Sequence, residues 1–149
     1  MPEKETLKRA RRDKRQGKSP STQGGEFVRE EIHHVREGKH GARSTKQAIA
    51  IGLSKARRAG VKLRAPKKGE SSARIRRTAK RDLSKGRRRS GTKRPSAKRS
   101  RGTLRSLRRE AHRSASRTAL ARQARSSARR RSAASRSRSA RKAARTRQR

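Results

Sequence analysis

Residues 24–63 read GGEFVREEIHHVREGKHGARSTKQAIAIGLSKARRAGVKL, and this segment carries most of the structural information in the chain. Nine of the sixteen Ile, Leu, Val, Met and Phe residues lie between Phe27 and Leu63. Only this segment combines apolar residues at helical spacing with residues that start and stop helices. The segments on either side of it are basic arms, so the folded part of the protein is expected here.

The first half of this segment predicts a helix at about residues 26–37. Val28, Ile32 and Val35 recur at positions i, i+4 and i+7, which places them on one face of a helix. Gly38 is a stop signal at the end of that pattern. A polar loop that contains two glycines follows the helix.

The second half predicts a helix at about residues 44–59. Ser44-Thr45-Lys46-Gln47 matches the capping box S-x-x-Q, in which the first residue caps the helix. Gly60 and Val61 fit the two positions that follow the cap in a Schellman motif. Gly52 lowers helix propensity inside the helix, and we interpret it as a point of close approach to the first helix. The two helices together form a hairpin.

The composition of the whole chain predicts that little else is folded. Leu, Ile, Val and Phe make up fifteen of 149 residues, and the net charge is +41. A share of these residues below roughly 20% with high net charge is typical of disordered proteins. The expected fold class is therefore a mostly disordered chain with a small all-α element. We expect a disordered basic leader and linker (1–25), a helical hairpin module (26–63) and a basic Arg/Ser/Ala-rich tail (64–149) with conditional helices.

The tail is the strongest indication of function. Residues 71–149 carry 31 basic and 2 acidic side chains, which favours a polyanionic partner. The chain has one Phe and no Tyr or Trp, so the bases of a single strand have almost no aromatic surface to stack on. The sequence therefore predicts binding to the phosphates of double-stranded DNA without sequence preference.

The basic residues expected to contact nucleic acid lie on the outer face of the hairpin and in the arginine clusters of the tail. They are Arg43, Lys46, Lys55, Arg57, Arg58, Lys62, Arg87, Arg88, Arg89, Arg129, Arg130, Arg131, Arg136, Arg138 and Arg141. A helix-turn-helix reader is disfavoured, because the hairpin loop is longer than the usual turn of about 3–4 residues and no third helix supports it.

No catalytic, metal or cofactor site is expected. His33, His34 and His40 lie near Glu30 and Glu37 in the sequence. Glu30 and His34 share a helix face at i, i+4, but two ligands on one helix fall short of a zinc site. The chain has no cysteine, which excludes disulfides and thiolate zinc sites. No set of nucleophile and base is recognisable, so we do not expect an enzyme.

Two other functions remain open at this point. Arginine-rich segments also bind RNA, so the alternative is an RNA- or ribosome-associated protein. In a different class of function, the hairpin docks a protein partner as an adaptor and the tail only localises it. A hairpin of this size is near the lower limit of independent stability, so self-association through it is also open. No apolar run approaches the roughly 20 residues of a membrane span.

Residues 25–63 resemble the shared segment of a family of small, highly basic bacterial proteins, sometimes labelled DNA-binding or plasmid-stabilisation proteins. The resemblance is carried by Gly38-Lys39-His40-Gly41, by STKQAIAIGLS at residues 44–54 and by ARRAGV at residues 56–61. It implies a bacterial, cytoplasmic protein associated with the nucleoid. The tail resembles histone-like and protamine-like tails in composition only.

Overall fold

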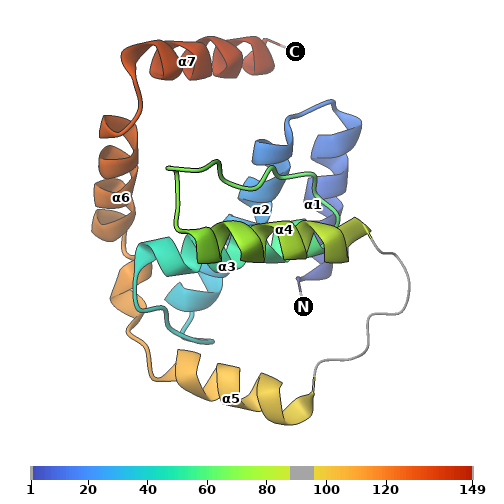
Figure 1. Ribbon diagram of the computed structural model, residues 1–149, viewed down its shortest axis with the longest axis vertical. Helices are drawn as coiled ribbons and strands as arrows, with labels where there is room; N and C mark the ends of the chain where they lie inside the picture. Colours follow the sequence, from blue (N-terminus) through green and yellow to red (C-terminus); the bar gives the residue numbers. More distant parts are fainter. Residues whose placement is uncertain (1, 88–95, 149) are drawn as a thin grey trace.

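Helices make up most of the chain in the computed structural model, which describes residues 2–87 and 96–148 (Figure 1). The chain is 73% helical, and no β-strand occurs within the described residues. The elements are α1 (Lys4–Arg15), α2 (Pro20–Arg36), α3 (Thr45–Arg58), α4 (Ala73–Arg87), α5 (Ala97–Arg108), the 3-10 helix η1 (His112–Ala115), α6 (Arg117–Arg129) and α7 (Ala133–Arg147). The prediction of a mostly disordered chain with a disordered leader is therefore wrong.

That prediction failed because it counted only large apolar residues. Six of the eleven buried apolar residues are alanines, namely Ala10, Ala42, Ala48, Ala56, Ala79 and Ala115. Alanine has the highest helix propensity and costs no side-chain entropy when it is buried. Helices that face each other with such small side chains approach closely, so this core needs few large apolar residues.

The predicted hairpin is confirmed as α2 and α3. At the start of α3, Ser44 Oγ accepts a hydrogen bond from Gln47 N (3.2 Å). At its end, Gly60 has a φ of +92°, and Val61 N donates to Ala56 O (3.1 Å), as in a Schellman motif. Both ends of α3 therefore lie where their sequence signals predict them.

α2 begins at Pro20, well before its predicted start at residue 26. Ser19 caps the helix, and Pro20 occupies the first turn, which suits its fixed φ. The predicted linker thus forms the first turns of α2. An added Cβ on Gly24 would lie 2.6 Å from Leu63 Cδ1, so this glycine allows the segment after α3 to cover α2.

α1 packs along α2 and completes one apolar cluster. Ala10 of α1 lies with Phe27, Ala56, Val61 and Leu63, and all five are buried. Phe27 is only 1% exposed, so the single Phe of the chain belongs to the core. The leader, expected as a solvated arm, is therefore part of the fold.

The close approach predicted at Gly52 is confirmed. A Cβ on this residue would lie 2.7 Å from Val28 Cα and 2.9 Å from Phe27 O, which are backbone atoms of α2. Real Cβ atoms essentially never lie under 3.0 Å from such atoms. Glycine at this position thus sets the distance between α2 and α3.

α4 lies across α3 on the side opposite to the hairpin partner. Ala79 and Asp82 of α4 are buried, and Asp82 Oδ2 accepts a hydrogen bond from Ser54 Oγ (2.7 Å). A Cβ on Gly86 would lie 2.0 Å from Arg57 O, so this glycine lets the end of α4 rest on the end of α3. We refer to α1–α4 as the bundle.

A second apolar cluster ties the tail to the bundle. Ala115, the last residue of η1, is buried with Ile32, Val35, Ala42 and Ala48. This single alanine fills the space between α2 and α3 near the hairpin loop. The tail is therefore anchored to the fold at η1.

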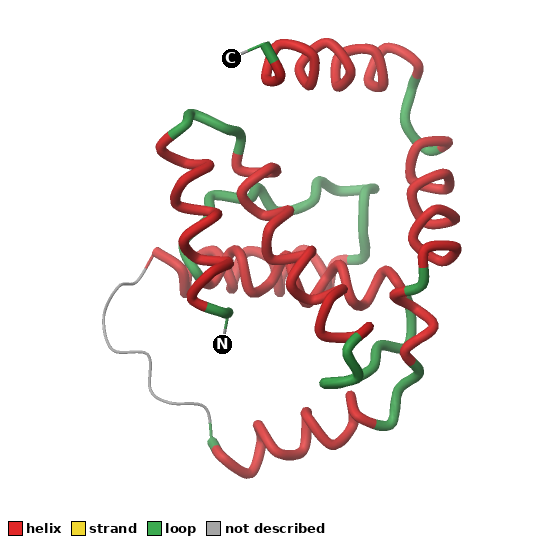
Figure 2. Tube along the Cα trace, turned by 180° about the vertical axis from the view of Figure 1, so that it is seen from behind, coloured by secondary structure: helices red, strands yellow, loops and turns green. Residues whose placement is uncertain are grey.

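Hydrogen bonds fix the same anchor. Gly41 N of the hairpin loop donates to Leu107 O (2.8 Å), and Thr45 Oγ1 donates to Ser114 O (2.6 Å). From this anchor α5, α6 and α7 extend around the bundle on three sides, as Figure 1 and the opposite view in Figure 2 both show.

Candidate nucleic-acid interface

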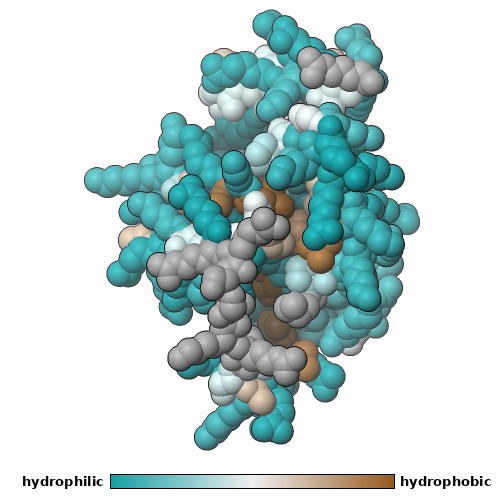
Figure 3. Space-filling view, turned by 90° about the vertical axis from the view of Figure 1, so that its right-hand side faces the viewer, coloured by the Kyte–Doolittle hydropathy of each residue, from teal (hydrophilic) through white to brown (hydrophobic). Residues whose placement is uncertain are grey.

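Exposed basic side chains cover the helices that follow the bundle. Every Lys and Arg side chain between Ser96 and Gln148 is exposed, and Glu110 is the only acidic residue in that range. Hydrophilic side chains cover most of the face shown in Figure 3, and apolar side chains are visible mainly near its middle. α5, α6 and α7 thus present cations with almost no competing anions.

Acidic side chains of the bundle form ion pairs with basic side chains of the bundle. Eight of the ten acidic residues lie in residues 1–70. Asp13 Oδ1 pairs with Lys18 Nζ (2.8 Å), and Glu26 Oε2 pairs with Arg9 Nε (2.6 Å). Such pairs neutralise anions that would otherwise repel a phosphate backbone.

Other contacts within the bundle lower the pKa of Glu3 and of Glu30. A hydrogen bond from His34 is the main cause that lowers the pKa of Glu3. Burial raises the pKa of Glu30, but hydrogen bonds from the Thr6 side chain and the Glu3 backbone, together with the charge of Lys55, outweigh it and lower the pKa overall. Both carboxylates are therefore ionised at neutral pH and act as internal counter-charges.

Four of the six predicted hairpin residues lie on the surface. Arg43, Lys46, Arg58 and Lys62 are exposed. The first two lie at the start of α3 and the last two at its end, so a helix of 14 residues, about 20 Å long, separates them. They form two separate basic spots and not one face.

Lys55 and Arg57 turn into the fold, although the sequence predicts them on the outer face. Lys55 Nζ lies 2.7 Å from Glu31 Oε2. Arg57 is 8% exposed, and its Nε donates to Leu63 O (3.3 Å). Burial lowers the pKa of Arg57, and the charge of Asp82 opposes this. The physical reason is that α2 and α4 cover α3 from two sides, which leaves little of its circumference free.

The predicted tail residues that the structure describes are all exposed. They are Arg87, Arg129, Arg130, Arg131, Arg136, Arg138 and Arg141. Arg88 and Arg89 lie outside the described residues. The fold brings Arg129, Arg130 and Arg131 together at the corner between α6 and α7, where Arg136 Nη1 donates to Arg131 O (2.9 Å). Arg87 ends α4, away from that corner (Figure 1).

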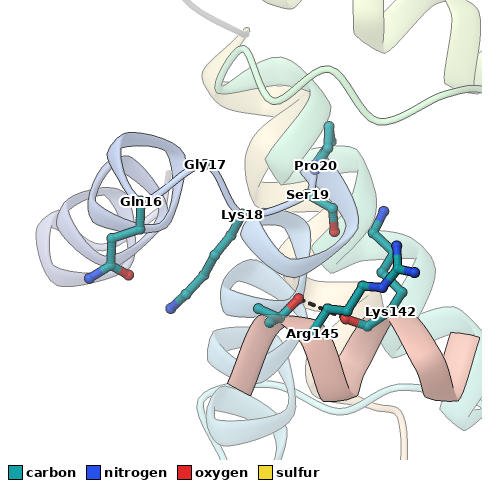
Figure 4. A pocket seen from close by; sticks show the side chains of 8 residues that line it. Gln16, Gly17, Lys18, Ser19, Pro20, Lys142 and Arg145 are labelled. Carbon is teal, nitrogen blue, oxygen red and sulfur yellow. Dashed lines mark hydrogen bonds between the residues drawn. The ribbon is translucent and has the colours of Figure 1, made fainter. Parts of the chain in front are cut away.

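A basic pocket between the α1–α2 turn and α7 was not predicted. It has a volume of about 560 Å³ and is lined by residues 16–20 together with Lys142, Arg145 and Thr146. In Figure 4, Lys142 and Arg145 project from α7 beside the turn that starts α2. Cations beside a helix start suit a phosphate group. The helix start is readable from Ser19-Pro20, but no sequence signal places α7 beside it.

Comparisons with known proteins add no assignment. No protein-family model matches the chain, and no curated protein or solved structure matches it either. The resemblance over residues 25–63 therefore stays a prediction. None of the described helices combines the length and the apolar character that crossing a bilayer requires.

Proposed function

We propose that the protein binds double-stranded DNA without sequence preference and associates with cellular DNA. The contacts come from the exposed arginines and lysines of α5, α6 and α7. The observation that carries the proposal is that every basic side chain in residues 96–148 is exposed, beside one acidic residue. A surface of this kind is the electrostatic footprint of a nucleic-acid-binding protein.

The amount of charge fits a duplex partner. Residues 71–149 carry 31 basic and 2 acidic side chains, a net charge of +29. Because duplex DNA has one phosphate charge per about 1.7 Å of its axis, this charge balances roughly 50 Å of duplex. Self-repulsion of the tail is relieved when phosphates lie between its helices, so binding also stabilises the folded tail.

Preformed helices favour this interaction further. α7 has 15 residues and α6 has 13, so each spans about 20 Å. Because the backbone of these helices is already ordered, binding does not lose the conformational entropy of ordering it, and the affinity is correspondingly higher. The basic pocket between α7 and the start of α2 gives one phosphate a site shared by the tail and the bundle.

Three arginines of α6 support the lack of sequence preference, whereas the guanidinium groups of Arg131 and Arg136 are hydrogen-bonded at the corner between α6 and α7. Reading a base edge requires a side chain fixed in one direction, whereas a phosphate contact does not. Among the described residues, no hydrogen-bonded neighbour fixes the guanidinium groups of Arg122, Arg125 and Arg129 on α6. Side chains without a fixed partner are free to follow the phosphates of any sequence.

The test is a binding experiment over a salt series with the full chain. Fluorescence anisotropy would compare two duplexes of unrelated sequence, a single strand of equal length and a structured RNA. We expect the duplexes to bind equally and most tightly, with log K falling linearly with log salt. Tighter binding of the RNA would contradict the proposal and favour the RNA alternative. Absence of binding near physiological salt would favour the adaptor alternative.

Two charge-matched variants separate the interface from net charge. The first replaces Arg129, Arg130 and Arg138 with Gln, and the second replaces the exposed Lys4, Arg11 and Arg12 of α1 with Gln. The first should reduce the salt slope by about 2–3, because each lost phosphate contact removes about 0.9. The second should change it little. Equal reductions would show that net charge alone, and not the tail surface, drives binding.

A further inference from the structure

We propose that Glu31, His34 and His40 form a binding site for a divalent transition metal, with zinc as the best fit. Sequence spacing alone favours Glu30 and His34, because they are four residues apart on one helix face. The fold instead brings Glu31 of α2 together with His34 of α2 and His40 of the loop. One ligand atom from each of the three lies within 4.8 Å of the other two.

The distances fit a tetrahedral ion. Glu31 Oε1 lies 3.3 Å from His40 Nε2. Ligand atoms at about 2.0–2.1 Å from a tetrahedral zinc lie roughly 3.3 Å from each other. This oxygen and this nitrogen are therefore already at the separation of two ligands of one zinc ion. His34 offers a third ligand atom within 4.8 Å of the other two.

The buried carboxylate is the second, independent observation. The Glu31 side chain is 0% exposed, and neither of its oxygens accepts a hydrogen bond within the described part of the chain. Lys55 Nζ lies 2.7 Å from Oε2, as an ion pair outside hydrogen-bond geometry. Oε1, which faces His40, has no donor. A buried carboxylate oxygen without a donor is costly, and a cation removes that cost.

The two histidines are oriented as metal ligands are. His40 Nδ1 lies 3.1 Å from Gly41 O, and His34 Nε2 lies 2.8 Å from Glu3 Oε1. Each imidazole thus has a backbone carbonyl or a carboxylate as partner for one ring nitrogen. For His40 the other nitrogen is Nε2, which lies 3.3 Å from Glu31 Oε1, and His34 would bind the metal through Nδ1. This outer set of acceptors is typical of histidines that bind zinc.

The local charge differs from that of the rest of the molecule. Lys55 is shared between Glu31 and Glu30, whose Oε1 lies 3.2 Å from its Nζ. Glu3 adds a further carboxylate beside His34, but Lys39 Nζ lies 3.3 Å from the same Glu3 Oε1 and offsets its charge. Glu30 and Glu31 against the single ammonium of Lys55, whose side chain is 22% exposed, leave one negative charge in excess, in a chain of net charge +41. A cation is therefore attracted to this place although the protein as a whole repels it.

A second pocket borders one of the three ligands, His34. It has a volume of about 240 Å³, and its lining also contains Glu3, Glu30 and the basic side chains of Arg9, Arg29 and Lys39. His34 lies between this pocket and the buried Glu31, and its side chain is 13% exposed.

The nature of the ligands selects the metal. Two imidazole nitrogens and one carboxylate oxygen suit zinc, and not magnesium or calcium, which prefer oxygen ligands. A glutamate and a histidine three residues apart on one helix form a ligand pair used in other helical metal sites. Here the glycine turn at Gly38 reverses the chain and brings His40 back over that pair.

The ion would join the hairpin loop to α2. His40 precedes Gly41, whose N–H donates to Leu107 O (2.8 Å) in the anchor of the tail. A metal that holds His40 against α2 thus holds the loop on which the tail docks. We expect zinc to raise the thermal stability of the protein and to stabilise the contacts between the hairpin loop and the tail.

The test uses the full chain after removal of metal with a chelator. Cobalt(II) serves as a spectroscopic probe, because tetrahedral coordination gives it an intense visible absorption, and zinc then displaces it. We expect one ion per chain and a rise in the unfolding temperature with zinc. His40→Gln should weaken zinc binding by about 100-fold or more, since even the loss of an outer partner costs about 10–100-fold.

His33→Gln is the matched control. His33 lies next to His34 on α2, but its side chain is 65% exposed and pairs with Glu37. This variant should bind zinc as the natural chain does. If His40→Gln loses helical circular dichroism, His34→Gln gives the same comparison. Equal weakening by His33→Gln and His40→Gln, or no stoichiometric binding to the natural chain, would overturn the proposal.

Discussion

Replacing Gly52 with alanine should destabilise the protein, although alanine is the better helix former. An added Cβ would lie 2.7 Å from Val28 Cα and 2.9 Å from Phe27 O. Both are backbone atoms, so no side chain can rotate away to make room. α2 must move away from α3 by roughly the 0.7 Å that separates 2.7 Å from an ordinary contact of 3.4 Å.

The magnitude follows from two opposing terms. The exchange of glycine for alanine inside a helix gains about 1 kcal/mol of helix propensity. Overpacking of a tight contact costs about 1–3 kcal/mol, and the rigid backbone contact here places the cost in the upper part of that range. We therefore expect a net loss of about 2 kcal/mol in the free energy of unfolding.

Gly25→Ala in α2 is the matched control, because nothing lies within 4 Å of a Cβ at that position. It gains the same propensity without the contact, so it should stabilise the protein by up to about 1 kcal/mol. Urea unfolding followed by circular dichroism measures both variants. The difference between them isolates the packing cost, about 2–3 kcal/mol. Equal stability of the two variants would refute the close approach of α2 and α3.

Four further changes test other parts of the fold. Ser44→Ala removes the cap of α3 and should cost about 1 kcal/mol in urea unfolding; no loss would mean that the capping bond does not form in solution. Arg57→Gln should cost about 1–3 kcal/mol through lost buried hydrogen bonds, but leave the DNA affinity of the folded protein unchanged. Gly41→Ala places a Cβ 1.8 Å from Glu110 O and should speed proteolysis before η1, whereas Gly102→Ala, which has nothing within 4 Å, should not. Stability should fall as the pH drops below 4.5, because the lowered pKa values of Glu3 and Glu30 contribute stability above that value and lose it as the pH passes through the folded-state pKa; an acid titration that shows no loss would contradict this.

Local signals predicted the hairpin well because they act within a few residues. The Ser44 cap, the Gly60 turn and the close contact at Gly52 each depend on neighbours in one helix or in one pair of helices. The same rules missed the early start of α2, where Ser19-Pro20 is itself a helix-start signal. The prediction instead interpreted residues 19–25 as a linker, because Ser, Pro, Thr and Gly are typical of loops.

The extent of folding was mispredicted because small apolar side chains were not counted. A threshold on Leu, Ile, Val and Phe measures large apolar area, whereas Ala115 seals a cluster with one methyl group. Alanine on a basic helix looks the same in sequence whether it faces solvent or a core. Only the long-range contact between η1 and the hairpin loop distinguishes the two.

In the candidate sites, too, features set by local sequence were predictable and features set by long-range contacts were not. Exposure of the tail arginines is predictable, because a chain with so few acids has no partners for them. Burial of Arg57 is not, because it depends on α4 crossing α3. Likewise, Glu31 becomes a candidate ligand only when the turn at Gly38 returns His40 to the side of α2.

The uneven placement of acids gives the molecule an electric dipole in addition to its net charge. Eight of the ten acidic residues lie in residues 1–70, and residues 71–149 carry a net charge of +29 against +12 for the first part. If the protein binds DNA as proposed, α5–α7 supply most of the attraction, so encounters in which these helices face the phosphates are favoured. Because they surround the bundle on three sides, the side of the bundle that they leave uncovered would then face away from the duplex.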